Sequence, residues 1–150
     1  MSDKLPGNLP LVTDVIPHRS PFLFLDEITG FDPDRASAEG RWLARPDADF
    51  FEGHFPDRPM VPGVILTEAI AQLGAYCIIT LDRTGPEPTE RIPLFGGIDK
   101  VRFRRMVEPG DLVNLHIELT RMSARAGRGT GTASVDGELA ANAELFFVMA

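Results

Sequence analysis

The pattern of hydrophobic and polar positions predicts one long apolar helix near the middle of the chain. Residues 64–81 contain no proline, their apolar side chains cover every face of the helix, and Glu68 is their only charged residue. A helix that is apolar on all sides is surrounded by protein or by lipid. The run is about as long as the shortest membrane span, but Glu68 and Gln72 interrupt it with polar groups. We therefore expect a buried core helix and no association with a membrane.

Strand-like patterns lie on both sides of this helix. Apolar and polar residues alternate after residue 91, most clearly over residues 112–120, as in a strand with one buried face. The pattern predicts strands at residues 22–31, 36–44, 92–106, 111–122 and 128–148. Turn signals lie at residues 110–111, 127–131 and 136–137. Together these segments predict an α+β fold in which an antiparallel sheet curls around one central helix.

Composition narrows the class of protein. A length of 150 residues predicts one domain, residues 1–150, large enough for a substantial core. The net charge of -7 argues against general nucleic-acid binding. Cys77 is the only cysteine and lies in the predicted core helix, so we expect no internal disulfide and a reducing cytoplasm. Residues 1–13 are polar and interrupted by prolines, which does not resemble a signal peptide.

The most distinctive polar residues lie around the start of the helix. His54 stands between Gly53 and Phe55 in a segment rich in glycine, proline and aromatic residues, and Glu68 and Gln72 share one helix face. A neutral imidazole can accept a proton near pH 7, whereas a carboxylic acid kept protonated by apolar surroundings can donate one. The structural alternatives are a packed histidine and a carboxylate held by Gln72 or an arginine. We favour an acid/base pair.

A metal site is the competing interpretation, because acidic residues lie close to His54 in the sequence: Asp47, Asp49, Glu52 and Asp57. A catalytic zinc site needs about three protein ligands at characteristic spacings such as H-E-x-x-H. That spacing is absent, and His18 and His116 lie far away in the sequence. We therefore expect no metal. We expect His116 on the exposed face of a strand, and His18 with Arg19 to shape the N-terminal turn.

Several short motifs in a fixed order identify a family. The chain contains IPHRSPFLFLD (residues 16–26), FEGHFP (51–56), PGV (62–64), EAIAQ (68–72), FGGID (95–99) and PGD (109–111). Together they resemble the FabZ-type 3-hydroxyacyl-acyl-carrier-protein dehydratases of bacterial fatty acid synthesis, over residues 15–147. Residues 34–49 match this family only loosely. Thr67 stands where the family usually has an aliphatic residue, and could affect helix packing or the acyl channel.

The resemblance implies a hot-dog fold and a homodimer, alone or within a larger oligomer built from dimers. In the family two protomers join edge to edge, and each active site takes its histidine from one protomer and its glutamate from the other. By this resemblance His54 is the base, Glu68 is the acid and Gln72 orients Glu68. Gly63 at the helix start presents an unpaired N–H, which by resemblance contacts the thioester oxygen. No step requires a cofactor.

Basic residues alternate near the end of a predicted strand. Lys100, Arg102 and Arg104 are spaced by two, so in a regular strand they point to one side. Ordinary surface solvation is the simple explanation. The functional hypothesis is a docking patch for acidic acyl carrier protein bearing a 3-hydroxyacyl phosphopantetheine thioester, because an acidic enzyme must overcome repulsion locally.

The combined expectation is a cytoplasmic hydro-lyase that converts 3-hydroxyacyl thioesters into trans-2-enoyl thioesters. A glutamate at position 68, where related bifunctional enzymes have aspartate, favours dehydration without isomerisation. A hot-dog thioesterase and an enoyl-CoA hydratase are the enzymatic alternatives, since both would use the same fold on a thioester. A non-catalytic acyl-binding protein is the alternative from another class.

Overall fold

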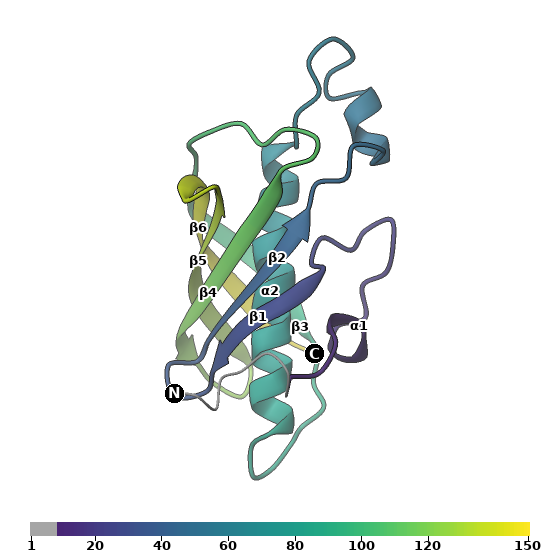
Figure 1. The fold of residues 1–150 in the computed structure, drawn as a ribbon. Helices are drawn as coiled ribbons and strands as arrows, with labels where there is room; N and C mark the ends of the chain where they lie inside the picture. The colour runs from purple at the N-terminus through teal and green to yellow at the C-terminus, as the bar shows by residue number, and fades with distance from the viewer. Residues whose placement is uncertain (1–8) are drawn as a thin grey trace.

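One long helix is wrapped by a six-stranded antiparallel sheet in the computed structural model, which describes residues 9–150 (Figure 1). The helix is α2 (Gly63–Arg83), and two short helical segments, α1 (Val12–Val15) and η3 (Asp49–Glu52), precede it. The strands are β1 (Glu27–Asp32), β2 (Ser37–Leu43), β3 (Pro93–Phe103), β4 (Leu112–Met122), β5 (Ala126–Val135) and β6 (Glu138–Met149), in the sheet order β1-β2-β4-β5-β6-β3. The predicted antiparallel sheet around one central helix is confirmed.

Helix α2 forms the centre of the core. Nearly all of its side chains between Leu66 and Thr80 are buried, and it contacts β2, β3, β4, β5 and β6. Within residues 9–150 it is the one helix long and apolar enough to cross a membrane, yet 78% of its most apolar window is buried inside the protein. The helix continues two residues beyond the predicted end, so Asp82 and Arg83 also belong to it.

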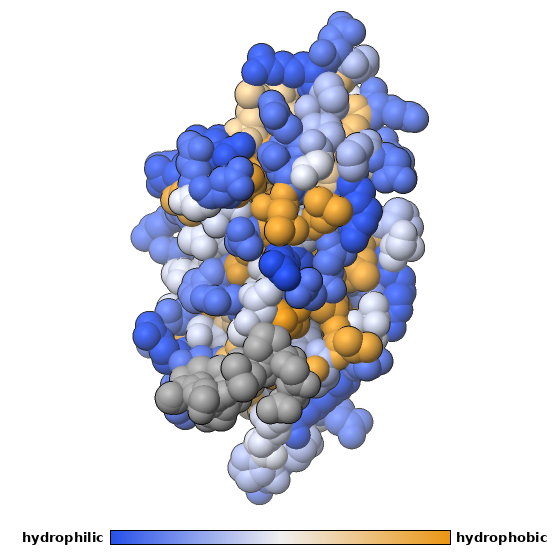
Figure 2. All heavy atoms as spheres, viewed as in Figure 1, coloured by the Kyte–Doolittle hydropathy of each residue, from blue (hydrophilic) through white to orange (hydrophobic). Residues whose placement is uncertain are grey.

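The alternation predicted for the later strands places their apolar residues on the helix side. In β4 the side chains of Val113, Leu115, Ile117 and Leu119 are buried, and the residues between them are more exposed. Figure 2 shows that the face seen in Figure 1 is largely hydrophilic, with hydrophobic side chains only in separate clusters. The sheet therefore has one dry face, against α2, and one wet face.

The turn predicted at residues 127–131 is wrong, because these residues lie inside β5. A Cβ atom at Gly131 would strike the side chain of Ile70, so the glycine allows α2 to approach the sheet closely. The chain instead turns before β5, where Ser123 N donates to Ala126 O at 2.9 Å. The turn at residues 136–137 is confirmed, with positive φ at both Asp136 and Gly137.

The strand predicted at residues 22–31 begins only at Glu27. Before it, the backbone of Phe22 and Phe24 runs along α2 and bonds to a side chain instead of a strand. Phe24 N donates to Gln72 Oε1 at 2.7 Å, and Gln72 Nε2 donates to Phe22 O at 3.0 Å. A helix glutamine thus replaces a sheet neighbour for this segment.

The two edges of the sheet differ. Strand β1 is short, whereas β3 is the longer edge and leaves large apolar side chains exposed at Leu94, Phe95, Ile98 and Phe103. A long apolar edge strand is a surface on which another chain can pair.

The assignment of residues 1–150 to one domain stays a prediction. Residues 1–8, part of the segment considered for a signal peptide, lie outside the described residues.

Candidate active site

His54 lies in a tight loop that fixes both its backbone and its ring. Met60 N donates to His54 O at 2.9 Å, and His54 Nδ1 lies 3.0 Å from Met60 O. A carbonyl oxygen can only accept, so Nδ1 must donate, and Nε2 keeps its lone pair. The ring of Phe55 stacks on the imidazole with ring centroids 4.1 Å apart. The half-buried His54 is therefore held in the tautomer that a general base requires.

The loop opens on a cleft of about 510 Å³ at the start of α2. His54, Gly63 and Phe103 are among its lining residues. Within residues 9–150 the Gly63 N–H has no hydrogen-bond partner, as expected for the first residue of a helix without a side-chain N-cap. A Cβ at Gly63 would lie only 2.7 Å from Phe103 Cζ, so only glycine leaves this ring in place. The cleft thus combines a base with a free N–H donor at the positive end of a helix.

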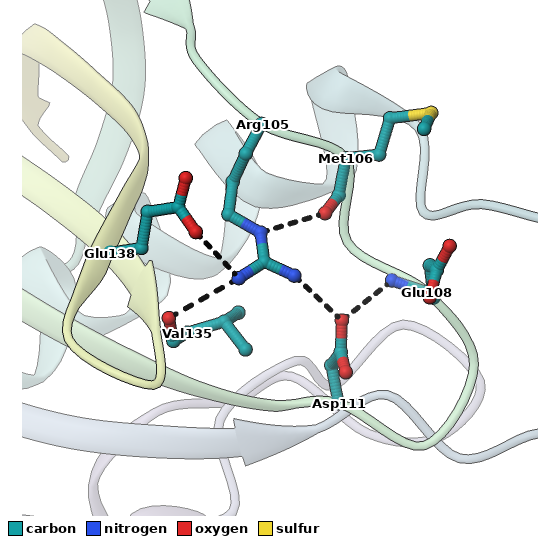
Figure 3. Close-up of polar contacts among 6 residues, drawn as sticks. All are labelled: Arg105, Met106, Glu108, Asp111, Val135 and Glu138. Carbon is teal, nitrogen blue, oxygen red and sulfur yellow. Dashed lines mark hydrogen bonds and ion pairs between the residues drawn. The ribbon is translucent and has the colours of Figure 1, made fainter.

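Arg105 stabilises the wall of this cleft (Figure 3). Its guanidinium contacts Asp111 Oδ2 at 3.7 Å, Glu138 Oε1 at 3.3 Å and the carbonyl oxygens of Met106 and Val135. Asp111 Oδ2 also accepts from Glu108 N at 2.8 Å. These contacts join the segment after β3 to the β5–β6 turn.

The same segment holds the loop that carries His54. Val61 N donates to Val107 O at 2.8 Å, directly after the residue whose carbonyl orients the imidazole. The backbone at Val61 is therefore tied to a segment that Arg105 already braces. This support keeps the histidine and the helix start in a fixed relation to each other.

Glu68 lies on α2 with its side chain 20% exposed, so it is less buried than its apolar helix suggested. Gln72 Nε2 donates to Glu68 Oε2 at 3.0 Å. Gln72 is itself 1% exposed, and its remaining polar groups bond to the backbone of Phe22 and Phe24. The amide is thereby fixed in orientation, and it fixes one oxygen of Glu68. Glu68 and Gln72 share one face of the helix, as predicted, and the role of Gln72 in orienting a catalytic acid stays a prediction.

His18 is the residue near this carboxylate that sequence reasoning missed. Its Nε2 lies 3.6 Å from Glu68 Oε2, although we expected His18 only to shape the N-terminal turn. Arg19 does brace that turn, since it donates to Thr13 O at 2.9 Å and to Ile16 O at 2.9 Å. The available signal was that His18 lies within the IPHRSPFLFLD motif, but only the fold brings that motif to Glu68.

The two predicted catalytic residues, His54 and Glu68, lie in different places in this chain. Gly63 lines the cleft with His54, whereas Glu68 lies five residues further along α2, beside His18 and Gln72. At about 100° per residue, Gly63 and Glu68 are about 140° apart around the helix axis. The cleft that contains His54 has no contribution from Glu68.

Other candidate chemistry finds no support among the described residues. Over residues 9–150, no group of His, Cys, Asp and Glu side chains is arranged to hold a metal ion. Cys77 is buried, and this burial raises the pKa of its thiol to about 12. Thr67 is buried, and its hydroxyl donates to Val64 O at 2.7 Å, so its polar group is satisfied within the helix. His116 lies on β4 with its side chain 40% exposed, as predicted.

The basic residues Lys100, Arg102 and Arg104 are exposed, but the end of β3 near them is not a regular strand. The pairing of β3 with β6 is interrupted between Asp99 and Arg102, and Lys100 has a positive φ of 52°. The predicted simple alternation is therefore wrong at Lys100. Lys100 Nζ lies 3.6 Å from Glu144 Oε2, while Arg104 Nε donates to Asn142 Oδ1 at 2.7 Å. Arg104 also lines the cleft that contains His54.

Three similar relatives of this chain carry the same name. The 3-hydroxyacyl-[acyl-carrier-protein] dehydratase FabZ of Clostridium botulinum (strain Kyoto / Type A2) is 45% identical over 138 residues, which are 92% of this chain and 92% of the relative. The FabZ proteins of Bacillus velezensis and Roseiflexus castenholzii are each 42% identical; the matches cover 92% and 95% of this chain and 94% and 96% of the relatives. The predicted likeness to FabZ-type dehydratases is confirmed.

Solved structures show the same architecture. The dehydratase heterocomplex ApeI:P from Xenorhabdus doucetiae matches with a TM-score of 0.74 and 18% identity, over 95% of this chain and 93% of that chain. The PaaI protein of E. coli, from the phenylacetic acid degradation operon, matches with a TM-score of 0.62 and 12% identity, over 83% and 78%. At such identities these matches support the predicted hot-dog fold and no particular activity. The FabA-like domain family matches residues 16–144, and the chain therefore belongs to this family.

Proposed function

We propose that this chain dehydrates 3-hydroxyacyl-acyl-carrier-protein to trans-2-enoyl-acyl-carrier-protein in fatty acid biosynthesis. The main support is the cleft at the start of α2, where the free Nε2 of His54 and the unpaired N–H of Gly63 lie together. Relatives at 42–45% identity named 3-hydroxyacyl-[acyl-carrier-protein] dehydratase support the same activity.

The proposed reaction begins at the carbon next to the thioester. His54 Nε2 takes a proton from C2, and the thioester oxygen accepts a hydrogen bond from Gly63 N–H as negative charge develops on it. The electrons of the broken C2–H bond form the double bond to C3, and the C3–O bond breaks. The hydroxyl leaves as water after it receives a proton from Glu68. Elimination of this kind transfers protons only and needs no cofactor.

The proton donor in this mechanism is Glu68 of a second protomer. This assignment is supported by the separation of the two half-sites, because His54 and Gly63 line one cleft while Glu68 lies about 140° away around α2. A partner joined along the exposed apolar edge β3 would cover Leu94, Phe95 and Ile98. We therefore propose a homodimer with two composite sites. Glu68, in place of an aspartate, favours an enzyme that dehydrates without isomerising its product.

The carrier would approach the open side of the cleft. Arg104 lies at the cleft beside His54, and Arg102 and Lys100 extend the basic surface along β3. Acyl carrier protein is acidic, and this chain has a net charge of -7, so a local cluster of positive charge would favour correct encounter. We propose the cytoplasm as the location, in keeping with a single, buried and unpaired cysteine.

One assay separates these functions. The wild-type protein is incubated with a 3-hydroxyacyl carrier thioester, and the product is analysed by mass. We expect a thioester lighter by one water. Release of free acid would indicate a thioesterase, and a clear preference for coenzyme A thioesters would indicate an enoyl-CoA hydratase. Tight binding without turnover would indicate an acyl-binding protein. Glu68→Gln is the inactive control, and His116→Gln, on the exposed face of β4, is the active control.

A further inference from the structure

His18 contacts the proposed proton donor without having a part in the reaction described so far. We propose that His18 is a positioning residue: together with Gln72 it holds oxygen Oε2 of Glu68 and leaves Oε1 to face the substrate. This inference rests on the proposed function, since that function makes Glu68 the proton donor.

Two nitrogen atoms approach the same oxygen of Glu68. Gln72 Nε2 donates to Oε2 at 3.0 Å, and His18 Nε2 lies 3.6 Å from Oε2. Within residues 9–150, no hydrogen bond or ion pair reaches Oε1 of Glu68. The distance of 3.6 Å is longer than a hydrogen bond, and catalytic contacts of this length often shorten when substrate binds. The arrangement makes the two oxygens of one carboxyl group unequal.

The turn that presents His18 is braced from both sides. Arg19 donates to the carbonyl oxygens of Thr13, Ile16 and His18, and Arg19 O accepts from Phe22 N at 2.8 Å. Beyond the turn, Gln72 Nε2 donates to Phe22 O at 3.0 Å. The same glutamine thus holds both Glu68 and the segment that carries His18. A side chain presented in this way keeps its geometry during the reaction.

The second ring nitrogen of His18 makes no polar contact with the described part of the protein. His18 Nδ1 is buried and has no hydrogen-bond partner among residues 9–150. Buried polar groups are nearly always satisfied by protein or by ordered water, so no protein contact through Nδ1 holds this ring among residues 9–150. With Nδ1 unsatisfied, the only polar contact of the ring is between Nε2 and Glu68. Because Oε2 is already an acceptor for Gln72, the hydrogen of the ring belongs on Nε2.

The two histidines near the site therefore have opposite tautomers. His54 donates from Nδ1 to Met60 O and offers the lone pair of Nε2 to the substrate, as a base must. His18 keeps its hydrogen on Nε2 and directs it at a carboxyl oxygen. One ring is arranged to receive a proton, and the other is arranged to orient the group that gives one.

Two substitutions test this role through the reaction. In His18→Gln the side-chain amide nitrogen can occupy the place of Nε2, whereas in His18→Asn it can reach only the place of Nδ1. We expect His18→Asn to lower kcat about 10–100-fold with little change in KM, and His18→Gln to retain most activity. His116→Gln is the control and should match the wild type. Equal losses in both His18 variants, or a loss in KM or in the unfolding temperature in place of kcat, would show that His18 is structural.

A spectroscopic measurement decides the same point without any turnover. The chain has 3 histidines, so nitrogen-15 spectra of the wild type and of His18→Asn identify the His18 ring. We expect hydrogen on Nε2 in His18 and on Nδ1 in His54. Hydrogen on Nδ1 of His18, or exchange between the two forms, overturns the inference even in an active enzyme. If the wild type fails to dehydrate the carrier substrate, the proposed function falls, and the tautomer still decides whether His18 is directed at Glu68.

Discussion

The two halves of α2, residues 63–72 and residues 73–83, are both largely apolar but have different surroundings. In the first half, Val64 is 69% exposed and the Glu68 side chain is 20% exposed, and both are next to loops. In the second half, residues 73–80 are all buried, and Leu73, Tyr76 and Cys77 are 0% exposed. The second half packs against the sheet and against the N-terminal segment, where Tyr76 Oη donates to Pro10 O at 2.7 Å. The first half extends to the loops that carry His18 and His54 (Figure 1).

This difference assigns separate tasks to one helix. The second half supplies apolar area to the core, which stabilises the fold without chemistry. The first half presents a helix N-terminus, a carboxylate and a free N–H where the substrate and the proposed second protomer would reach them. Substitutions at the accessible positions of the first half, Gly63, Val64 and Glu68, should therefore affect turnover more than stability, and substitutions in the second half should do the reverse.

The largest expected effect concerns the two proposed catalytic residues. His54→Ala and Glu68→Gln should each lose about 10²–10⁴-fold in kcat, because each removes a positioned base or acid. Both should remain folded, since His54 is in a loop and Glu68 is partly exposed. Turnover and thermal unfolding of the two variants are the measurements.

A mixture of these two variants tests the composite site. A heterodimer would contain one site with His54 and Glu68 both native, so activity should return after subunit exchange. Each variant alone, treated in the same way, is the control. Absence of recovery after exchange has been demonstrated would refute the shared site and would place both residues in one protomer.

The next effect is on stability in the second half of the helix. Leu73→Ala should lower the free energy of unfolding by about 2–5 kcal/mol, because Leu73 is fully buried and a cavity would remain. Val64→Ala, at a position 69% exposed, should change it by less than about 0.5 kcal/mol. Urea unfolding measures both. Similar losses for the two variants would contradict the contrast between the halves.

A smaller effect on turnover is expected at the helix start. In Gly63→Ala the added methyl group would lie 2.7–2.9 Å from ring atoms of Phe103, so the ring must move within the cleft. We expect kcat to fall about 10–100-fold, because the thioester can no longer approach the N–H closely. Stability should not fall, since alanine favours a helix more than glycine does. Wild-type kcat in this variant would remove Gly63 from the mechanism.

The basic patch should affect encounter and leave chemistry unchanged. Reversing the charges of Lys100 and Arg102 should lower kcat/KM for carrier-bound substrate about 10-fold at low salt, and added salt should reduce the difference. A short pantetheine thioester should be used equally well by wild type and variant. The control is Arg35→Glu, an exposed arginine in the turn between β1 and β2, at the edge of the sheet opposite β3. Equal losses on both substrates would show that these residues shape the site itself.

The smallest effect is expected at Cys77, deep in the second half. Burial raises the pKa of its thiol to about 12, so at pH 8 almost none of it is thiolate, the form that reacts with alkylating reagents. Iodoacetamide should leave the native protein unlabelled and should label it fully in urea, as measured by intact mass. Rapid labelling of the native protein would show that the second half of α2 opens readily.

The sequence pattern predicted correctly those elements whose surroundings in the fold agree with their local pattern of apolar and polar residues. The alternation in residues 112–120 identified β4 correctly, because every second side chain faces α2. The bounds of the helix were predicted within a few residues, since a long apolar run in a small protein is stable only when it is buried in the core. The glycines of β5 misled the prediction, because Gly131 is explained by contact with Ile70 and not by a turn.

The sequence by itself determined the fold class, the family and the candidate residues His54, Glu68, Gly63 and Gln72, because these depend on local pattern and on motifs in a fixed order. Only the tertiary structure decided which residues distant in the sequence are in contact. Gln72 takes the place of a strand for residues 22–24, and His18 reaches Glu68, over a sequence separation of 50 residues. Such contacts arise when the chain folds back on itself, and no periodicity along the chain encodes them.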